Sequence, residues 1–551
     1  MGRKFTQWKP RSEKRPESFP ELASILLENR SFEPLSKLEY GDHGMDKALQ
    51  SIGSAIEQKK RIALYADYDV DGTMSCVSWI WFLQAIGFSN FIHYIPCRFK
   101  EGYGVNLKAI QHLIENEHAE VIITMDTGIT ANEEAAYCRD RGIEFICTDH
   151  HKIQPEKMPD CIILNPKAHP DPRYQELCGC GITFVLLRRL SERFPLPDEV
   201  WTDLLALVGM ATICDVVPLN CVNHRLARQG VAALMRSRRP VLKGLREAGS
   251  LIKDIDEKDL GFRLGPRINA VGRLGHADQV IEAFIGDDPT TLIQYMGTCN
   301  DRRKQIQKDI VNEARLAAQK VASDPILFLG GDWHAGVVGI AASKIAEEFW
   351  RPTWLFQRKD GVCKGSARSI NGFDVTLAMQ LNGEGFTKFG GHRAAAGFSF
   401  PVEKENEIRE RLIAYGKSQR ESSPSTWESL IQFDCDLPMS LAEISLTEHL
   451  DELKPFGHGF EEPRFRLDTK ILGTQFYCDK DTGERKHTAV KIPGPRGRTQ
   501  KIMFFNEVHP ELEKCERAKF VVSASRNTFQ GNVSLSLTGF DFEVMETDLR
   551  L

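Results

Sequence analysis

The sequence predicts an α/β protein in which a parallel-sheet lobe is joined by a long helix to a second α/β lobe, with an all-β barrel at the C-terminus. Three observations predict this order. Short apolar runs alternate with amphipathic stretches from about residue 60 to 165, a long charged helical stretch follows at about 300–322, and runs of period-two alternation lie near the C-terminus. A chain of 551 residues is also too long for one ordinary core, which suggests roughly three or four domains.

The first lobe is predicted from five β-type runs. They read IALYADYD, FIHYIPCR, VIITMDTG, IEFICTDHH and CIILNPK, and helical segments such as LKAIQHLIENE and ANEEAAYCRDRG separate them. Strands interleaved with helices indicate βαβ units and a parallel sheet that is covered on both faces. In such sheets ligands bind beyond the carboxyl ends of the strands, so we expect a site there.

The remaining segments set the expected boundaries. A helical stretch at 202–219 should end near Asp215, before a proline, and the glycine- and arginine-rich GFRLGPRINAVGRLGHAD follows it. KSQRESSPST (417–426) has the composition of a linker. We expect a basic, mobile arm at 1–45, the first lobe at 46–225, a helical connector at 226–322, the second lobe at 323–420 and the barrel at 427–551.

Composition restricts the class of protein. With 42% hydrophobic and 27% charged residues it is typical of a globular protein, and the longest nearly apolar stretch, Cys76–Phe88, is too short to span a bilayer, so no membrane is expected as a partner. The fourteen cysteines include no CxxC pair, which predicts reduced thiols and a cytoplasmic location. The net charge of −5 still permits a local basic groove.

The stretch RIALYADYDVDG (61–72) raises the question of a bound cation. Its three aspartates, Asp67, Asp69 and Asp71, repel one another unless a cation lies among them. The same spacing opens an EF-hand calcium loop. That loop needs a glutamate at its twelfth position, where this sequence has Ser78, and it follows a helix, whereas IALYA is β-type. Both failures disfavour a calcium sensor.

A metal centre is predicted instead from residues that follow several of the strands. The candidates are Asp69, Asp71, Asp126, His150 and Asp215, with Asp67 and His151 close by. Carboxylates with one or two imidazoles suit Mn²⁺ or Mg²⁺ better than structural zinc. Two cations about 3.5–4 Å apart that share a carboxylate would form a hydrolytic centre. Any single aspartate could merely cap a helix or turn, but the set as a whole favours metal.

An ordered series of motifs resembles the DHH phosphoesterase family, named for the tripeptide that stands here at 149–151. The series is YADYDVDG, RFKEGYG, MDTG, TDHH, ATICDVVPL, GPRINAVGR, GSARS and GGHRAAAGF. The resemblance implies a DHH lobe, a DHHA1-type lobe that clamps the substrate, and an oligonucleotide-binding (OB) barrel. It further implies a metal-dependent exonuclease that degrades single-stranded DNA from 5′ to 3′ in repair and recombination.

Two alternatives stay open at this point. One is a DHH phosphoesterase of a small substrate such as an oligoribonucleotide, a cyclic dinucleotide or pyrophosphate, but such members generally lack the barrel and the long connector. The other is a DNA-binding scaffold with an inactive centre, which would not need five convergent metal-binding groups.

The resemblance also implies roles for individual residues. Asp69 would hold one of two Mn²⁺ or Mg²⁺ ions, Asp71, His150 and Asp215 the other, and Asp126 would bridge them. His151 is expected to face the scissile phosphate, so the expected catalytic residues are Asp126, His150 and His151. Asp67 and Asp149 would be outer partners of this centre.

Substrate binding needs positive charge and close backbone approach around the phosphates. The candidates in the connector and second lobe are Arg267, Asn269, Arg273, Ser366, Arg368, Gly391 and His392. The candidates in the barrel are Arg496, Arg498, Lys501, Phe504, Arg526 and Phe529. The expected partner is single-stranded DNA, and the resemblance leaves open a helicase and a single-strand-binding protein.

Overall fold

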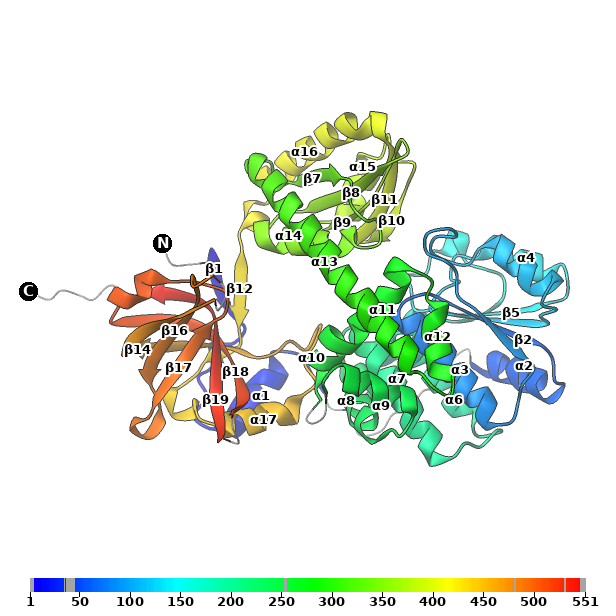
Figure 1. Ribbon diagram of the computed structural model, residues 1–551, viewed down its shortest axis with the longest axis horizontal. Helices are drawn as coiled ribbons and strands as arrows, with labels where there is room; N and C mark the ends of the chain where they lie inside the picture. Colours follow the sequence, from blue (N-terminus) through cyan, green and yellow to red (C-terminus); the bar gives the residue numbers. More distant parts are fainter. Residues whose placement is uncertain are drawn as a thin grey trace, which may run out of the picture. The chain divides into compact units, whose positions relative to one another are not determined.

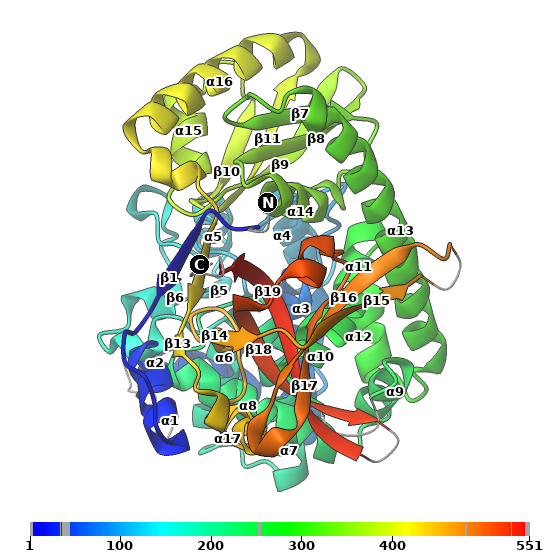
Figure 2. The same cartoon turned by 90° about the vertical axis from the view of Figure 1, so that its left-hand side faces the viewer.

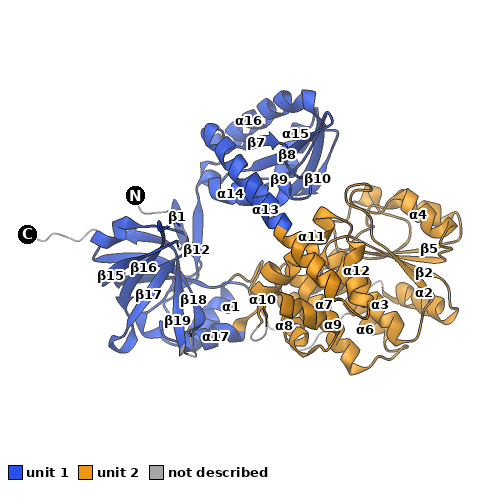
Figure 3. Cartoon of the chain, in the orientation of Figure 1, with its two compact units in different colours: residues 1–31, 302–452, 462–551 blue, residues 32–301, 453–461 orange. Residues whose placement is uncertain are grey.

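The computed structural model describes residues 4–33, 35, 45–251, 255–479, 482–529 and 532–545. It consists of two compact units (Figure 3). Unit 1 comprises residues 1–31, 302–452 and 462–551, and unit 2 comprises residues 32–301 and 453–461. Among the helices of the described ranges, none has both the length and the apolar character that a membrane crossing requires.

Unit 2 is built around a five-stranded parallel sheet (Figure 1). In spatial order its strands are β3 (Phe91–Tyr94), β2 (Ile62–Ala66), β4 (Val121–Met125), β5 (Glu144–Thr148) and β6 (Ile162–Leu164). All five predicted strands and their parallel pairing are confirmed. The chain runs from β2 outward to β3 and returns on the other side of β2 with β4, so the strand order reverses between β2 and β4. Such a reversal is where ligands bind in open α/β sheets.

Helices cover both faces of this sheet. Ile62 and Leu64 of β2 belong to the apolar cluster that contains residues of α2 (Met45–Glu57), α3 (Val70–Ala85), α6 (Gly179–Leu190) and α7 (Asp198–Cys214). Ala63 and Tyr65, which point the other way, belong to the cluster with α4 (Leu107–Glu115) and α5 (Asn132–Arg139). Burial on both faces explains why the strands read as continuous apolar runs.

A helical region completes unit 2. It contains α8 (Cys221–Arg236), α9 (Pro240–Ala248), α10 (Glu257–Asp259), α11 (Gly265–Leu274) and α12 (Asp278–Ile285). The long helix α13 (Thr290–Lys320) follows, and the boundary between the two units falls inside it. The helix was predicted from about residue 300. Its first turns escaped that prediction because Ile293 and Met296 are core residues of unit 2 and lack the charged pattern of the rest.

Unit 1 contains a mixed five-stranded sheet. Its order is β10 (Lys388–His392), β11 (Ala395–Pro401), β9 (Val362–Arg368), β8 (Thr353–Lys359) and β7 (Leu327–Gly331). Its helices are α14 (Val338–Phe349), α15 (Val375–Leu381) and α16 (Glu405–Ser422). The linker predicted at 417–426 is therefore wrong for its first six residues. Burial of Ile408 and Leu412 anchors the first turns of α16, and the helix continues through polar residues that carry no apolar period.

The C-terminal part of unit 1 is a seven-stranded sheet. Its order is β13 (Cys435–Asp436), β14 (Arg464–Lys470), β18 (Arg517–Phe529), β19 (Asn532–Val544), β17 (Thr499–Phe504), β16 (Arg485–Pro493) and β15 (Gly473–Cys478). Helix α17 (Ser445–Leu453) precedes β14. The period-two runs RFRLDTKILGTQF, KIMFFN, KFVVSASRNTF and VSLSLTGFDFEV coincide with β14, β15, β17, β18 and β19, whereas β16 was not predicted.

The N-terminal segment is not the mobile arm that its composition predicts. Strand β1 (Gln7–Pro10) pairs in parallel with β12 (Leu430–Phe433) (Figure 1), and helix α1 (Phe19–Glu28) follows (Figure 2). Trp8 donates its indole N–H to Asp541 at 2.6 Å. The prediction failed because these partners lie more than 400 residues away along the chain, and a local pattern carries no sign of them.

A buried ion pair anchors this N-terminal segment. Arg30 donates to Asp434 at 2.6 Å, and their side chains are only 1% and 3% exposed. Replacing Arg30 by Met should lower the free energy of unfolding by about 3–5 kcal/mol, because the Asp434 charge stays buried without its cation. Urea denaturation of the full-length protein measures the change. The matched control is Lys14→Met in the exposed Lys14–Glu28 pair, where about 0–1 kcal/mol is expected. Equal effects of the two substitutions would contradict the prediction.

Candidate metal centre

Acidic and histidine side chains from five segments of unit 2 meet at the carboxyl end of the parallel sheet. Ala66 of β2 is in register with Met125 of β4, which is in register with Thr148 of β5, so the residues that follow these strands lie side by side. They are Asp67 and Asp69 after β2, Asp71 in the first turn of α3, Asp126 after β4, and Asp149, His150 and His151 after β5. Asp215, the residue that ends α7, joins them.

The possible ligand atoms fall into three groups, each within 4.8 Å. The groups are Asp71 with His150 and Asp215, Asp67 with Asp69 and Asp126, and Asp126 with His150 and His151. His150 Nε2 lies 3.1 Å from Asp126 Oδ1 and 3.5 Å from Asp215 Oδ2. All five predicted metal ligands therefore lie together, and Asp126 belongs to two groups. Asp67, expected as an outer partner, has an oxygen placed like that of a ligand.

Glycines make the close approach of these carboxylates possible. A Cβ at Gly72 would lie 2.4 Å from the carbonyl oxygen of Asp67, so the loop after β2 can close only with glycine there. A Cβ at Gly179 would lie 2.7 Å from Cβ of Asp126. The backbone N–H groups of Gly179 and Cys180, at the start of α6, donate to the Asp71 carboxylate at 2.6 and 2.8 Å. Sequence reasoning missed Gly179, because only the fold brings α6 to this site.

Asp126 itself has a strained backbone. Its φ of +58° lies in the left-handed region, which non-glycine residues other than Asn and Asp seldom adopt. Strain of this kind persists only where the surroundings hold it in place, and it concentrates at functional sites. Asp126 is the one candidate metal ligand among the described residues that has a positive φ.

The cluster is electrostatically unfavourable without a cation. Burial, aided by the neighbouring Asp71 carboxylate, raises the pKa of Asp126 and of Asp215 well above the usual range. Burial and the nearby Asp69 raise the pKa of Asp71 to about 6. Among the described residues, buried oxygens of Asp67, Asp126 and Asp215 have no hydrogen-bond donor. The site thus contains an imidazole and several buried carboxylate oxygens that lack a hydrogen-bond donor. This set of groups fits hard divalent cations.

His151 is held from both sides of its ring. Nδ1 lies 2.7 Å from Asp149 Oδ1, and Nε2 lies 2.8 Å from the hydroxyl of Tyr103. Asp149 also accepts from the backbone N–H of Ile129 at 2.9 Å. Burial would raise the pKa of Asp149, but hydrogen bonding to His151 and its charge outweigh it, so that pKa is lowered. Tyr103 lies in the quoted RFKEGYG motif, yet nothing in the sequence assigned it a contact.

Asp149→Asn tests this arrangement. We expect cleavage to fall by roughly 10–100-fold, the usual cost of losing a partner that orients a functional histidine. The amide cannot accept both the His151 ring N–H and the Ile129 backbone N–H as a carboxylate does. Turnover at saturating substrate measures the loss, with Asp160→Asn, an exposed residue outside the site, as the control. Wild-type turnover in Asp149→Asn would contradict a role for the contact.

GPRINAVGR forms helix α11 and not a phosphate-binding loop. Asn269 Oδ1 accepts the backbone N–H of Val70 at 3.1 Å, so it supports the loop that carries the aspartates. A Cβ at Gly272 would lie 2.9 Å from the carbonyl oxygen of Tyr68. The absence of a side chain at Gly272 therefore lets α11 pack closely against the backbone at Tyr68. Arg267 and Arg273 are half-buried in the same helix. Substrate binding by these residues stays a prediction.

The substrate-binding candidates of the second lobe align across three strands. Ala395 of β11 is in register with His392 of β10 on one side and with Arg368 of β9 on the other. A Cβ at Gly339, in the first turn of α14, would lie 2.9 Å from Ser366 Oγ and 3.0 Å from Arg368 Nη2. Gly391 has φ +147°, and a Cβ there would lie 2.4 Å from the Ala395 carbonyl oxygen. The sheet therefore brings Ser366, Arg368 and His392 to neighbouring positions.

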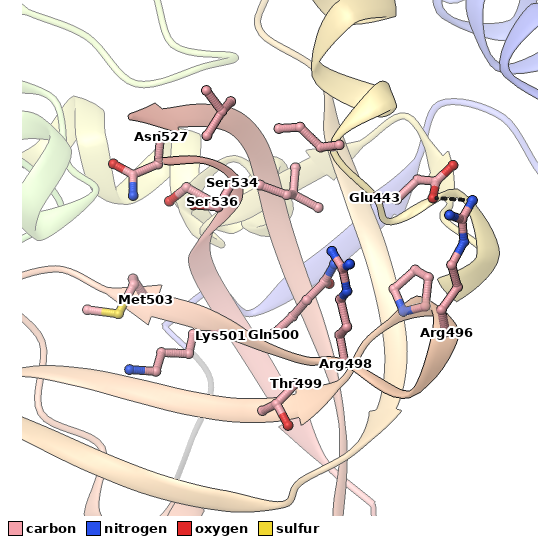
Figure 4. A pocket seen from close by; sticks show the side chains of 14 residues that line it. Glu443, Arg496, Arg498, Thr499, Gln500, Lys501, Met503, Asn527, Ser534 and Ser536 are labelled. Atoms are coloured by element: carbon pink, nitrogen blue, oxygen red, sulfur yellow. Dashed lines mark ion pairs between the residues drawn. The ribbon is translucent and has the colours of Figure 1, made fainter. Parts of the chain in front are cut away.

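The C-terminal sheet has a cavity of about 550 Å³ (Figure 4). Arg496, Arg498 and Lys501 line it, as do Asn527 and polar residues of β19, and none of its lining residues is aromatic. Arg496 lies 3.6 Å from Glu443. The structure contradicts a stacking role for Phe504, which is fully buried in the sheet core. Arg526 is exposed and does not line the cavity, and the side chain of Phe529 lies outside the described residues.

Three family models match separate parts of the chain. The DHH family N-terminal domain matches residues 61–212, the DHHA1 domain matches residues 315–418, and the RecJ OB domain matches residues 433–539. The first match ends three residues before Asp215 and contains the other predicted metal ligands.

Similar proteins extend over most of the chain. It is 34% identical over 507 residues to the single-stranded-DNA-specific exonuclease RecJ of Bacillus subtilis, a match covering 90% of this chain and 61% of that one. It is 32% identical to the protein of the same name from Escherichia coli, covering 95% of this chain and 96% of that one. The crystal structure of RecJ in complex with Mn²⁺ from Thermus thermophilus superposes with a TM-score of 0.83 at 25% identity, covering 98% of this chain and 80% of that one.

Proposed function

Because the chain belongs to the RecJ family of DHH phosphoesterases, we propose that it is a metal-dependent exonuclease that hydrolyses single-stranded DNA. The observation that carries the proposal is the convergence of the five predicted ligands in three overlapping groups, with Asp126 and His150 each belonging to two of them. We further propose 5′ to 3′ polarity, a cytoplasmic location, a role in repair and recombination, and cooperation with a helicase and a single-strand-binding protein.

The residues of the centre have distinct proposed roles. Asp71, His150 and Asp215 would hold one Mn²⁺ or Mg²⁺ ion, Asp69 the other, and Asp126 both, with Asp67 as an additional candidate for the second ion. When bound, the two cations supply positive charge to the phosphate oxygens and lower the pKa of water at the site. His151, oriented by Asp149 through Nδ1, would donate through Nε2 to a non-bridging phosphate oxygen in place of its contact with the Tyr103 hydroxyl.

One assay tests the proposed substrate. A 5′-labelled single strand, its duplex form and a dinucleotide are incubated with Mn²⁺ or Mg²⁺, and the products are separated by length. We expect rapid loss of the single strand and slow loss of the duplex. Preference for the dinucleotide would favour a small-substrate phosphoesterase, and absence of cleavage would favour an inactive scaffold. A 3′-labelled strand run in parallel reports the polarity.

The cavity of the C-terminal sheet is the proposed binding surface for the strand. Three positively charged side chains line this cavity and no aromatic side chain does, which predicts that the strand binds through its phosphates more than through base stacking. Replacing Arg498 and Lys501 by Ala should reduce the slope of log affinity against log salt by about 0.7 per residue, the value for single strands. Fluorescence anisotropy with a labelled oligonucleotide measures it. Arg517→Ala, a cation paired with Asp468 outside the cavity, is the control, and unchanged slopes would contradict the assignment.

A further inference from the structure

Residues 453–461 connect helix α17 to strand β14 of the C-terminal sheet, yet they pack as part of unit 2. Phe460 is fully buried, and its ring centre lies 4.6 Å from that of Phe32 and 4.9 Å from that of His224. His224 Nε2 also lies 2.9 Å from the carbonyl oxygen of Leu453. The 453–461 segment is therefore anchored on unit 2 near both of its ends.

Between these anchors, His458 bonds the stretch that follows Asp215. The backbone N–H of Leu219 donates to the carbonyl oxygen of His458 at 2.7 Å. The His458 ring donates through Nδ1 to the carbonyl oxygen of Val216 at 3.0 Å. Glycines on either side of His458 permit this approach, since a Cβ at Gly457 would lie 2.8 Å from the Leu219 side chain and Gly459 has φ +74°.

Val216 needs an external support because its own conformation is unfavourable. Its φ is +59°, and β-branched residues are genuine outliers in the left-handed region. Val216 is 62% exposed, so burial in a core cannot offset the strain. Strained backbone persists only where the surroundings hold it. Among the described residues, the His458 ring supplies a contact to the Val216 carbonyl oxygen from outside the loop that contains Val216.

The conformation of Val216 matters because Asp215 directly precedes it. Asp215 ends α7, and its backbone N–H donates to the carbonyl oxygen of Ala211 at 2.9 Å. Its Oδ2 is buried with no donor among the described residues and lies 3.5 Å from His150 Nε2. The direction of this carboxylate is thus set by the backbone on either side: the helix before it and the Val216 peptide after it.

We propose that His458 is a positioning residue for the metal centre: it holds Val216 in the left-handed conformation and so fixes the Asp215 carboxylate toward His150 and Asp71. The inference rests on the proposed function in one respect, namely that Asp215 is a metal ligand. His458, in the C-terminal third of the chain, thereby contributes to the metal affinity of a centre whose ligands lie between residues 67 and 215.

Direct binding of Mn²⁺ to the metal-free, full-length protein tests the proposal. Titration calorimetry is run on the wild type, His458→Ala, His458→Asn and Asp215→Asn. We expect His458→Ala to weaken Mn²⁺ binding by roughly 10-fold, the low end of the range for residues that orient ligands. His458→Asn should retain most of the affinity because its amide nitrogen can donate from a position close to that of Nδ1. His487→Ala, which removes a histidine that accepts the Asn506 backbone N–H in the C-terminal sheet, is the matched control.

A double-mutant cycle separates positioning from general loss of structure. Glycine adopts the left-handed conformation without strain, so in a Val216→Gly background His458→Ala should cost clearly less affinity than it does alone. The melting temperature without metal shows whether His458→Ala merely destabilises unit 2, in which case affinity would follow stability and His458→Asn would not restore it.

The outcomes distinguish this inference from the proposed function. Wild-type Mn²⁺ affinity in His458→Ala, together with weakened affinity in Asp215→Asn, overturns the role of His458 alone. Wild-type affinity in both variants overturns the assignment of Asp215 as a ligand. If the effects of His458→Ala and Val216→Gly on Mn²⁺ affinity are fully additive, the mechanism through the Val216 backbone is overturned, even if His458→Ala weakens binding.

Discussion

Asp126→Asn is expected to reduce cleavage by more than about a thousandfold, equivalent to at least about 4 kcal/mol in the activation free energy. Asp126 belongs to two of the three ligand groups and lies 3.1 Å from His150, which belongs to the third, so its loss affects both proposed metal positions. Asparagine is the suitable replacement because it has the same shape and tolerates the φ of +58°, at which alanine would be strained. Cleavage of a labelled single strand at saturating Mn²⁺ measures the effect.

The same substitution should stabilise the metal-free protein. Asp126 is a buried carboxylate among others, and burial and the Asp71 charge raise its pKa, so removing its charge relieves repulsion. Thermal unfolding in EDTA is therefore expected to move to a higher temperature. Asp160→Asn, at a side chain that is 85% exposed, is the control for both measurements and should change neither. Substantial cleavage by Asp126→Asn would exclude the bridging role.

The metal-free protein is expected to lose stability as pH rises from about 5 to 8. Burial raises the pKa of Asp71 to about 6 and those of Asp126 and Asp215 well above their usual range, whereas unfolded aspartates titrate near 3.9. The folded state therefore binds more protons than the unfolded state over this interval. Stability falls with pH wherever that holds, so the penalty is absent below the unfolded pKa and complete above the folded one.

Mn²⁺ should reverse this dependence. Metal binding requires the carboxylates to be ionised, so the stabilisation by metal grows with pH. At a concentration 100 times its dissociation constant, one bound ion contributes about 2.7 kcal/mol. Melting temperatures measured at pH 5, 6.5 and 8, with EDTA and with Mn²⁺, should diverge toward high pH. The Asp126→Asn variant should have a shallower slope in EDTA than the wild type, and a wild-type slope that is flat or rises with pH would contradict the electrostatic account.

Sequence patterns predicted the parallel sheet of unit 2 well because its central strands β2 and β4 are buried on both faces and therefore read as local apolar runs. The same patterns missed β16, and they failed where the partners are distant along the chain, as for β1. The candidate metal ligands were predicted from their chemistry and from the order of the motifs. Their division into groups within 4.8 Å, and the place of Asp67 among them, came only from the geometry.

Local periodicity and side-chain chemistry were sufficient to predict the strands of the parallel sheet, the motif series and the residue types of the candidate metal centre. The tertiary structure decided that Asn269 supports the Val70 backbone, that Gly179 lies against Asp126, and that His458 reaches the loop after Asp215. Each of these contacts joins residues between about 50 and 250 positions apart in the chain. Such contacts form only after separate elements pack, and no short stretch of sequence contains both partners.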